Sequence, residues 1–182
     1  MEMYLYHYYE KSQGPFKSLS DLNMQEAEQI QNLIRKEGTL FASNRSENYI
    51  QIRFELEALA RRLFIKKGGK PVNKSPHYMT LGACPWIKTW YVSGEEIKIN
   101  VNEFEPKTIS FTYGDLFPTM RFDDDKSYRK MIYTLEEIEE IIEIYGLPQE
   151  WNEDGAKGPE RYIEVQIWDH KPLTKYENNI LN

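Results

Sequence analysis

The 182-residue sequence contains a single cysteine, Cys84, and no long run of apolar residues. One cysteine cannot form an internal disulfide, and no residue joins it at metal-ligand spacing, so a reducing compartment is expected. No segment approaches the roughly 18 consecutive apolar residues that cross a bilayer. The chain also opens without the basic leader and apolar segment of a secretory signal. These features predict a soluble cytoplasmic protein without a membrane partner.

Positive charge is scarce as well. The sequence has 23 Lys and Arg against 29 Asp and Glu, mixed along the chain, and its net charge is -6. Such a surface repels a phosphate backbone, so we expect no nucleic-acid partner. A chain of this length buries enough surface for one core. We therefore expect residues 1–182 to form a single globular domain, with fraying expected from about Leu173.

The familiar catalytic and cofactor motifs are missing. His7, His77 and His170 show none of the helical pair spacings of zinc enzymes, so we predict no metal site. Neither a Gly-x-Ser-x-Gly elbow nor a dinucleotide fingerprint occurs, and we predict no cofactor. The glycines at 68–69 follow a helix, whereas a phosphate loop precedes one. The aspartates at 123–125 lack the spacing of a calcium loop and indicate a solvated turn.

Apolar residues at helical spacing predict three principal helices. Two of them open with a capping box, in which a polar side chain and a glutamate three residues later bond each other's backbone N–H groups. These boxes are Asn23 with Glu26 and Thr134 with Glu137. Together with the glycines that follow, they predict helices over about 24–37 and 135–145, and a third apolar stripe predicts a helix over about 46–67.

Alternating apolar and polar residues predict strands at 3–9, 97–101, 109–113 and 161–168, with another just after His77. Because only a short loop separates 97–101 from 109–113, we expect these two strands to be antiparallel neighbours. The fold predicted is a single α+β domain. Its sheet is mixed or mostly antiparallel, with about five or six strands, and three principal helices pack on it.

Arg53, Glu57 and Arg61 lie one turn apart beside the apolar stripe of the predicted 46–67 helix. Such a row is typical of a solvated helix face with ion pairs along it. In the alternative interpretation, Arg45, Arg53 or Arg61 reaches an anionic ligand, which requires a cavity next to the helix.

Three residues are candidates for catalysis. Glu164 emerges on the polar face of its strand between Tyr162 and Trp168, where a carboxylate could act as a base or stabilise a cation. Asp115 follows Gly114 at a strand end, and His77 sits at a strand start, both frequent positions for site residues. The catalytic candidates are therefore His77, Asp115 and Glu164.

Aromatic and hydroxyl side chains close to these three predict an aromatic-lined cleft for a small-molecule ligand or substrate. The ligand-binding candidates are His7, Tyr78, Tyr113, Thr112 and Trp168. A protein-interaction module without chemistry is an alternative, in which exposed Trp86, Trp90 and Tyr91 form a partner patch. The sequence predicts neither a reaction nor an oligomeric state.

An early strand with Tyr6-His7-Tyr8, later tyrosines, and Glu164 on the final strand follow one another along the chain. This order resembles the histidine, tyrosine and glutamate order of toxin-like ADP-ribosyl transferases. The resemblance implies an enzyme that uses a nicotinamide dinucleotide, with His7 on the nicotinamide ribose, tyrosines around the nicotinamide and Glu164 assisting the sugar cation. The two helices expected before Pro76 depart from that family.

Overall fold

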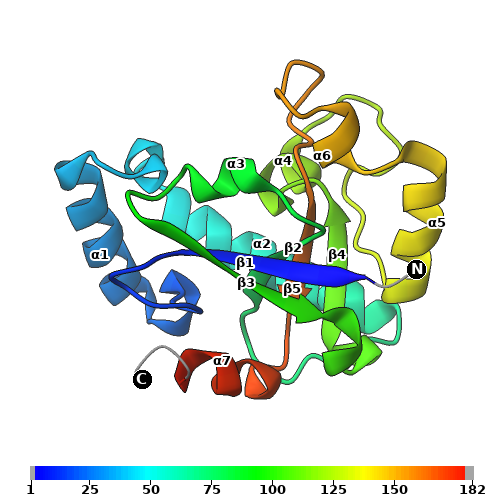
Figure 1. Ribbon diagram of the computed structural model, residues 1–182, viewed down its shortest axis with the longest axis horizontal. Helices are drawn as coiled ribbons and strands as arrows, with labels where there is room; N and C mark the ends of the chain where they lie inside the picture. Colours follow the sequence, from blue (N-terminus) through cyan, green and yellow to red (C-terminus); the bar gives the residue numbers. More distant parts are fainter. Residues whose placement is uncertain (1–2, 179–182) are drawn as a thin grey trace.

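The computed structural model describes residues 3–178, which form a single-domain α+β fold around one five-stranded sheet (Figure 1). Within the described chain, every pair of neighbouring strands is antiparallel, and the strand order is β3-β1-β2-β5-β4. The fold class predicted from the sequence is confirmed. The strands are β1 Tyr4–Glu10, β2 His77–Leu81, β3 Gly94–Asn100, β4 Ile109–Tyr113 and β5 Ile163–Ile167.

The three predicted helices are confirmed. They are α1 Met24–Glu37, α2 Tyr49–Lys66 and α5 Leu135–Tyr145. Both predicted capping boxes are present, and Gly38 ends α1 in the left-handed conformation. Shorter α-helices are α3 Pro85–Lys88, α4 Leu116–Arg121, α6 Pro148–Trp151 and α7 Thr174–Asn178; the 3-10 turns are η1 Leu19–Asp21, η2 Phe41–Asn44, η3 Val101–Glu103, η4 Pro106–Thr108 and η5 Lys171–Leu173.

Helices cover both faces of the sheet at β5. The face that carries Ile163, Val165 and Ile167 joins the main apolar core, which includes Ile138 of α5. The opposite face meets the cluster formed by α2 and α4, where Trp168 is fully buried. All five residues of β5 are therefore buried, polar ones included. A buried polar side chain needs a hydrogen-bond partner, so the polar face of β5 is structurally constrained.

The predicted pairing of 97–101 with 109–113 is wrong. The two segments form most of β3 and all of β4, which lie at opposite edges of the sheet. β3 pairs with β1, while β4 pairs with β5, and the turns η3 and η4 carry the chain from one edge to the other. Alternation along a strand specifies which side chains share a face, but it does not specify the partner strand.

The C-terminal part that the structure describes packs against the sheet. Leu173, where fraying was expected to begin, is fully buried, and α7 follows it; the last four residues lie outside the described range. None of the helices within residues 3–178 has the length and apolar character to cross a membrane.

Candidate functional site

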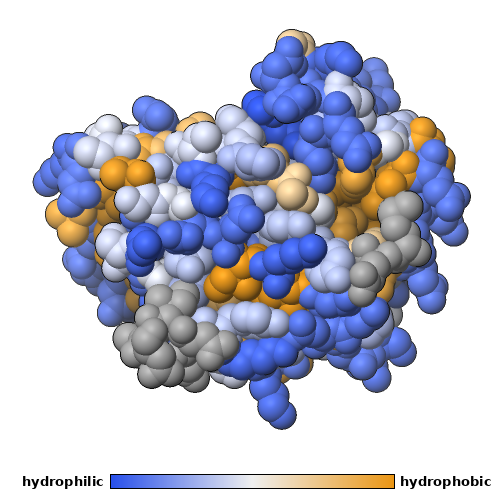
Figure 2. Space-filling model, in the orientation of Figure 1, coloured by the Kyte–Doolittle hydropathy of each residue, from blue (hydrophilic) through white to orange (hydrophobic). Residues whose placement is uncertain are grey.

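A cleft of about 1720 Å³ opens where the ends of β1, β2 and β5 meet α1 and the start of α2. One of its walls is apolar, because Ile30, Leu33 and Ile34 of α1 face it. Leu33 is 59% exposed, and Figure 2 shows a hydrophobic area where α1 lies, among several on this face. The remaining lining is rich in aromatic and ionisable groups, so the cleft combines an apolar wall with a polar floor.

Five of the eight catalytic and ligand-binding candidates predicted from the sequence line this cleft. They are His7, His77, Tyr78, Asp115 and Glu164. Their positions follow from the sheet, because the register of β2 against β5 pairs Thr80 with Glu164. Residues from four separate segments are thereby brought to one cavity.

The other three predicted residues lie elsewhere. Trp168 is fully buried and donates from Nε1 to Ser110 Oγ at 2.8 Å. Thr112 is also fully buried, where its Oγ1 accepts from Gln166 Nε2. Tyr113 lines a separate pocket of about 400 Å³ with Tyr145 and donates from its hydroxyl to the Gly146 carbonyl at 2.9 Å. The structure therefore does not bring these three into the cleft.

Asp115 and Glu164 form a carboxyl pair at the floor of the cleft. Gly114 ends β4 with φ 109°, and Asp115 then caps α4 by accepting from the Phe117 N–H at 2.8 Å. The second carboxylate oxygen of Asp115 accepts from the Tyr162 hydroxyl at 3.0 Å. Glu164 Oε1 accepts from the Leu116 N–H at 3.2 Å, so the two acids flank the same turn.

The two acids raise the cost of ionisation for each other. Burial, followed by the charge of Asp115, raises the pKa of Glu164 well above its ordinary value. Burial also raises the pKa of Asp115, although the bonds from Phe117 and Tyr162 act in the opposite direction. Both carboxylate oxygens of Asp115 accept a hydrogen bond, and the charges of Arg45 and Arg53 also lower its pKa. Among the described residues, by contrast, the donors to Glu164 reach Oε1 alone. We therefore assign the ionised form to Asp115 and the shared proton to Glu164 near neutral pH. A neutral acid next to a carboxylate is an arrangement suited to proton transfer.

A buried row of hydrogen bonds holds Glu164 in place. Trp168 donates to Ser110, and the Ser110 hydroxyl donates to Gln166 Oε1 at 2.8 Å. Gln166 Nε2 in turn donates to Glu164 Oε1 at 3.2 Å. No hydrogen bond to Glu164 Oε2 occurs within the described residues, so this atom is the one available to a ligand.

The arginine row of α2 is not a solvated face, which corrects the sequence interpretation. Arg53 and Glu57 are 8% and 2% exposed, and Arg53 Nε lies 3.0 Å from Glu57 Oε1. Tyr78 donates to the same carboxylate oxygen at 2.7 Å. Arg61 binds the carbonyl groups of Pro71 and Asn73. Arg53 and Glu57 are buried and Arg61 is half-buried, because this side of α2 also packs against the rest of the domain, where Arg53 and Glu57 pair with each other and Arg61 with backbone carbonyls.

Arg45 differs from these arginines. Its guanidinium lies over the Tyr49 ring at 4.2 Å and donates to Gln31 Oε1 at 3.3 Å. Among residues 3–178, no carboxylate lies within ion-pair distance of Arg45, although it lines the cleft that contains Asp115. Burial lowers the pKa of Arg45, yet an arginine stays charged near neutral pH. The cavity that an anion-binding arginine requires is thus present.

His7 is occupied by the backbone. Its Nε2 accepts from the Phe16 N–H at 2.9 Å, and its Nδ1 lies 3.1 Å from the Tyr78 carbonyl oxygen. These partners require the neutral tautomer with hydrogen on Nδ1. Burial accordingly lowers the pKa of His7 to about 4. Neither nitrogen is free to hold a ribose, the role that the transferase resemblance implies.

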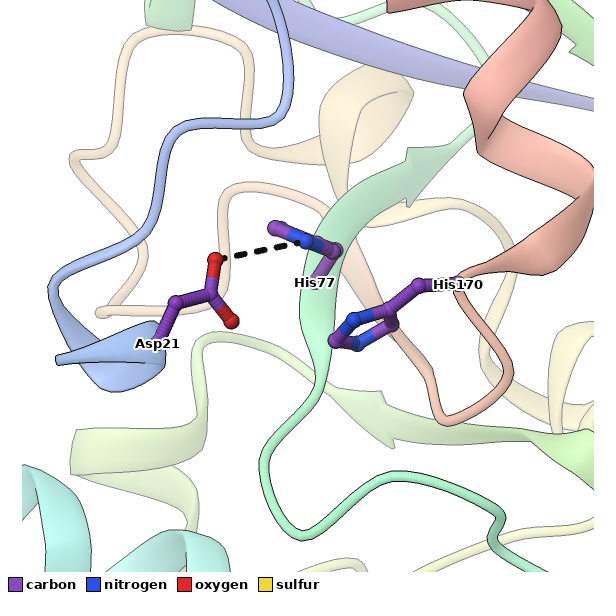
Figure 3. Close-up of side chains that lie close together, drawn as sticks. All are labelled: Asp21, His77 and His170. Atoms are coloured by element: carbon purple, nitrogen blue, oxygen red, sulfur yellow. Dashed lines mark ion pairs between the residues drawn. The ribbon is translucent and has the colours of Figure 1, made fainter.

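His77 lies in a second group of ionisable side chains at the cleft. Asp21 of η1 and His170 before η5 approach it, and one ligand atom from each residue lies within 4.8 Å of the others (Figure 3). His77 Nε2 is 3.6 Å from Asp21 Oδ2. Burial, and next the neighbouring His170, lower the pKa of His77 to about 3. These three residues all line the cleft.

Trp86 and Trp90 pack on each other instead of standing apart. Their ring centroids are 5.0 Å apart, and Phe41 stacks on Trp90 at 4.3 Å. Both tryptophans are half-buried, as is Tyr91, which lines the cleft. The partner patch stays a prediction, and contacts within the chain already cover much of the surface of its aromatic rings.

The fold and its cleft define a single-domain α+β protein with a carboxyl pair and an arginine at one cavity. No protein-family model, curated protein or solved structure matches the chain. Sequence patterns did not single out Tyr162, Asp21 or His170 as site residues. Tyr162 was noticed only as a neighbour of Glu164, and the other two join His77 from distant segments.

Proposed function

We propose that the cleft binds a small organic anion with an apolar or aromatic part. Glu164, with Asp115 beside it, transfers a proton to the bound anion. The carboxyl pair carries this proposal, because burying two acids beside one cavity costs stability, and acids with raised pKa values are concentrated at functional sites. Arg45 supplies the charge for the anion, and the α1 wall supplies the apolar surface.

The proposed roles follow from the hydrogen bonds. Glu164 carries its proton toward the cleft on Oε2 and acts as the general acid. Asp115 remains a carboxylate, held by Tyr162 and the Phe117 N–H, and keeps the proton on Glu164 through its charge. Once Glu164 has given up its proton, the same charge favours reprotonation, which returns the pair to its starting state.

Thermal unfolding with a panel of aryl carboxylates, acyl phosphates and nucleoside monophosphates tests binding. A ligand at 100 times its Kd stabilises the fold by about 2.7 kcal/mol. We expect Arg45→Gln to weaken the binding of a panel member at least about tenfold. Arg62→Gln, which removes an exposed arginine of α2, is the matched control. Equal affinity in Arg45→Gln and the wild type would remove Arg45 from the site.

Glu164→Gln separates binding from chemistry. The amide preserves the shape of the side chain but cannot give up a proton, so the variant should keep the ligand affinity of the wild type. Turnover of that ligand should fall by about 10²-fold or more. Unchanged turnover would show that Glu164 is not the acid.

The ADP-ribosyl transferase resemblance supplies a second candidate, which the presence of Tyr78 and Glu164 at one cleft favours, whereas the occupied ring nitrogens of His7 do not. Titration of the protein with nicotinamide dinucleotide, followed by thermal unfolding, distinguishes the two. An increase in the unfolding temperature with the dinucleotide would support the transferase candidate if Glu164→Gln keeps this increase and Tyr78→Phe reduces it. No shift at millimolar concentration argues against a nicotinamide site.

A further inference from the structure

Asp21, His77 and His170 converge on one point at the edge of the cleft. Asp21 comes from the turn before α1, His77 opens β2, and His170 follows β5 (Figure 3). The register of β2 against β5 pairs His77 with Ile167, which brings His170, three residues further on, beside the His77 ring. The two imidazole centroids are 4.1 Å apart.

Ser75 positions two members of the group from outside it. Its carbonyl oxygen lies 3.1 Å from His170 Nε2, and its hydroxyl donates to the Ser20 carbonyl at 3.0 Å. A hydrogen on His170 Nε2 leaves the Nδ1 lone pair free for a ligand bond, and a backbone carbonyl is a usual orienting partner for a metal-binding histidine. Ser20 precedes Asp21 directly, so Ser75 links the supports of both residues.

His77 has no such partner. Neither of its ring nitrogens makes a hydrogen bond within the part of the chain that the structure describes, although the residue is only 5% exposed. Its ring nitrogens are not among the buried atoms that lack a partner, so the imidazole presents an unoccupied lone pair to the cleft, beside Asp21 Oδ2. A bound ion would use this lone pair.

We propose that Asp21, His77 and His170 bind one divalent transition-metal ion, with zinc as the reference ion. Two imidazole nitrogens and one carboxylate oxygen suit Zn²⁺ and its first-row neighbours, and do not suit Ca²⁺ or Mg²⁺. Two atoms bound to one zinc ion lie about 3.4 Å apart. The ligand atoms of the three residues now lie within 4.8 Å of one another. Small side-chain rotations would bring them to about 3.4 Å, and the half-exposed Asp21 side chain has room to rotate.

Three protein ligands leave at least one coordination position open, as in catalytic zinc sites. All three residues line the cleft, so the open position faces the cavity where a ligand would bind. The ion would add positive charge to a cleft that already carries Arg45. The metal site goes beyond the proposed proton transfer and does not depend on it, since ion binding is measured without any organic ligand.

Calorimetric titration of the chelator-treated full chain with Zn²⁺ tests the site. We expect one ion per chain, and a visible absorption band when Co²⁺ replaces Zn²⁺. His77→Gln, His170→Gln and Asp21→Asn should each weaken Zn²⁺ binding at least about tenfold. Asp169→Asn is the matched control, because Asp169 precedes His170 and lines the cleft outside the triad; it should bind Zn²⁺ as the wild type does.

Thermal unfolding without metal shows whether each variant folds. If a histidine variant fails to fold, Asp21→Asn still tests the site, because Asp21 is exposed and its substitution should leave the fold intact. The absence of binding at micromolar Zn²⁺ would overturn the proposal. So would binding that the folded triad variants leave unchanged, or binding that Asp169→Asn weakens as much as Asp21→Asn does. None of these three results bears on the acid pair, because Glu164→Gln is tested with organic anions.

Discussion

Glu160 and Glu164 lie four residues apart and are both buried, but within residues 3–178 only Glu160 forms ion pairs. Glu160 forms ion pairs with Arg129 and with Lys126, the latter at 3.0 Å. Among the described residues, Glu164 accepts hydrogen bonds from neutral groups, and Asp115 is the charge with the largest effect on its pKa. The Glu160 carboxylate has cationic partners, whereas burial and the charge of Asp115 oppose ionisation of Glu164, so the same substitution should have opposite effects.

Glu164→Gln should stabilise the protein at pH 7 by about 1 kcal/mol, because the amide removes the cost of holding a buried acid near Asp115. Glu160→Gln should destabilise it by about 3 kcal/mol, because Arg129 then loses a buried partner. Urea unfolding of both variants measures these changes. Destabilisation by Glu164→Gln would show that its carboxyl group contributes to the fold rather than costing stability.

The effect of Glu164→Gln should depend on pH. The folded pKa of Glu164 is raised, so its unfavourable contribution applies above the unfolded value of about 4.3 and disappears below it. The stability difference between variant and wild type should therefore shrink as pH falls from 7 to 4. A difference that is constant over this range would contradict a raised pKa.

His7 should make the fold sensitive to acid. Its folded pKa is about 4, below the ordinary value of 6.5, so the stability it contributes is present above pH 6.5 and is lost as pH falls toward 4. The limiting slope for one proton is about 1.4 kcal/mol per pH unit. His7→Gln should be less stable at pH 7 and show a shallower slope in urea unfolding from pH 7 to 4.5. Parallel slopes would assign the acid sensitivity to other groups.

Gly114 and Gly38 both adopt positive φ, but their surroundings differ. A Cβ at Gly114 would lie 3.2 Å from Thr119 Oγ1, whereas one at Gly38 meets nothing within 4 Å. Gly38→Ala should cost about 1 kcal/mol from the backbone alone, and Gly114→Ala about 2 kcal/mol or more. Thermal unfolding compares them, and equal costs would mean that the turn before Asp115 adapts to the added methyl group.

Ser110→Ala should cost about 2 kcal/mol, since it leaves the buried Trp168 Nε1–H without an acceptor. Ser127→Ala, which removes an exposed bond to the Tyr145 hydroxyl, should change stability by less than about 0.5 kcal/mol. Denaturant unfolding of the two variants provides the comparison. A cost near zero for Ser110→Ala would mean that water or a shifted neighbour replaces the hydroxyl.

Local signals predicted the helices and the faces of the strands. The boxes at Asn23 and Thr134 and the stop at Gly38 act within one turn, so they are readable from neighbouring residues. Partner choice in the sheet depends on contacts between distant segments, which is why β3 and β4 were placed together incorrectly. Arg53 shows the same limit, since its burial depends on what α2 packs against.

The candidate site divides in a similar way. Alternation along β5 predicts that Glu164 and Val165 lie on opposite faces of the strand, and the glycine before Asp115 marks a strand end. Both acids are therefore predicted as site residues from the sequence. Trp168 and Thr112 share a polar face with Glu164, but α2 and α4 cover that face beyond the cleft. Asp21 and His170 are separated by most of the chain, and spacing along the sequence cannot bring them together.

The antiparallel pairing of β2 with β5 stabilises the sheet and also positions residues of the cleft. Thr80 lies opposite Glu164 on one face of the sheet, and His77 lies opposite Ile167 on the other, so one alignment sets the face from which the acid and the imidazole each reach the cleft. Insertion of a single residue into β5 would preserve a strand-forming sequence yet send Glu164 into the apolar core and Val165 into the cavity. A well-folded relative that had gained or lost one residue there would keep the scaffold while losing its chemistry.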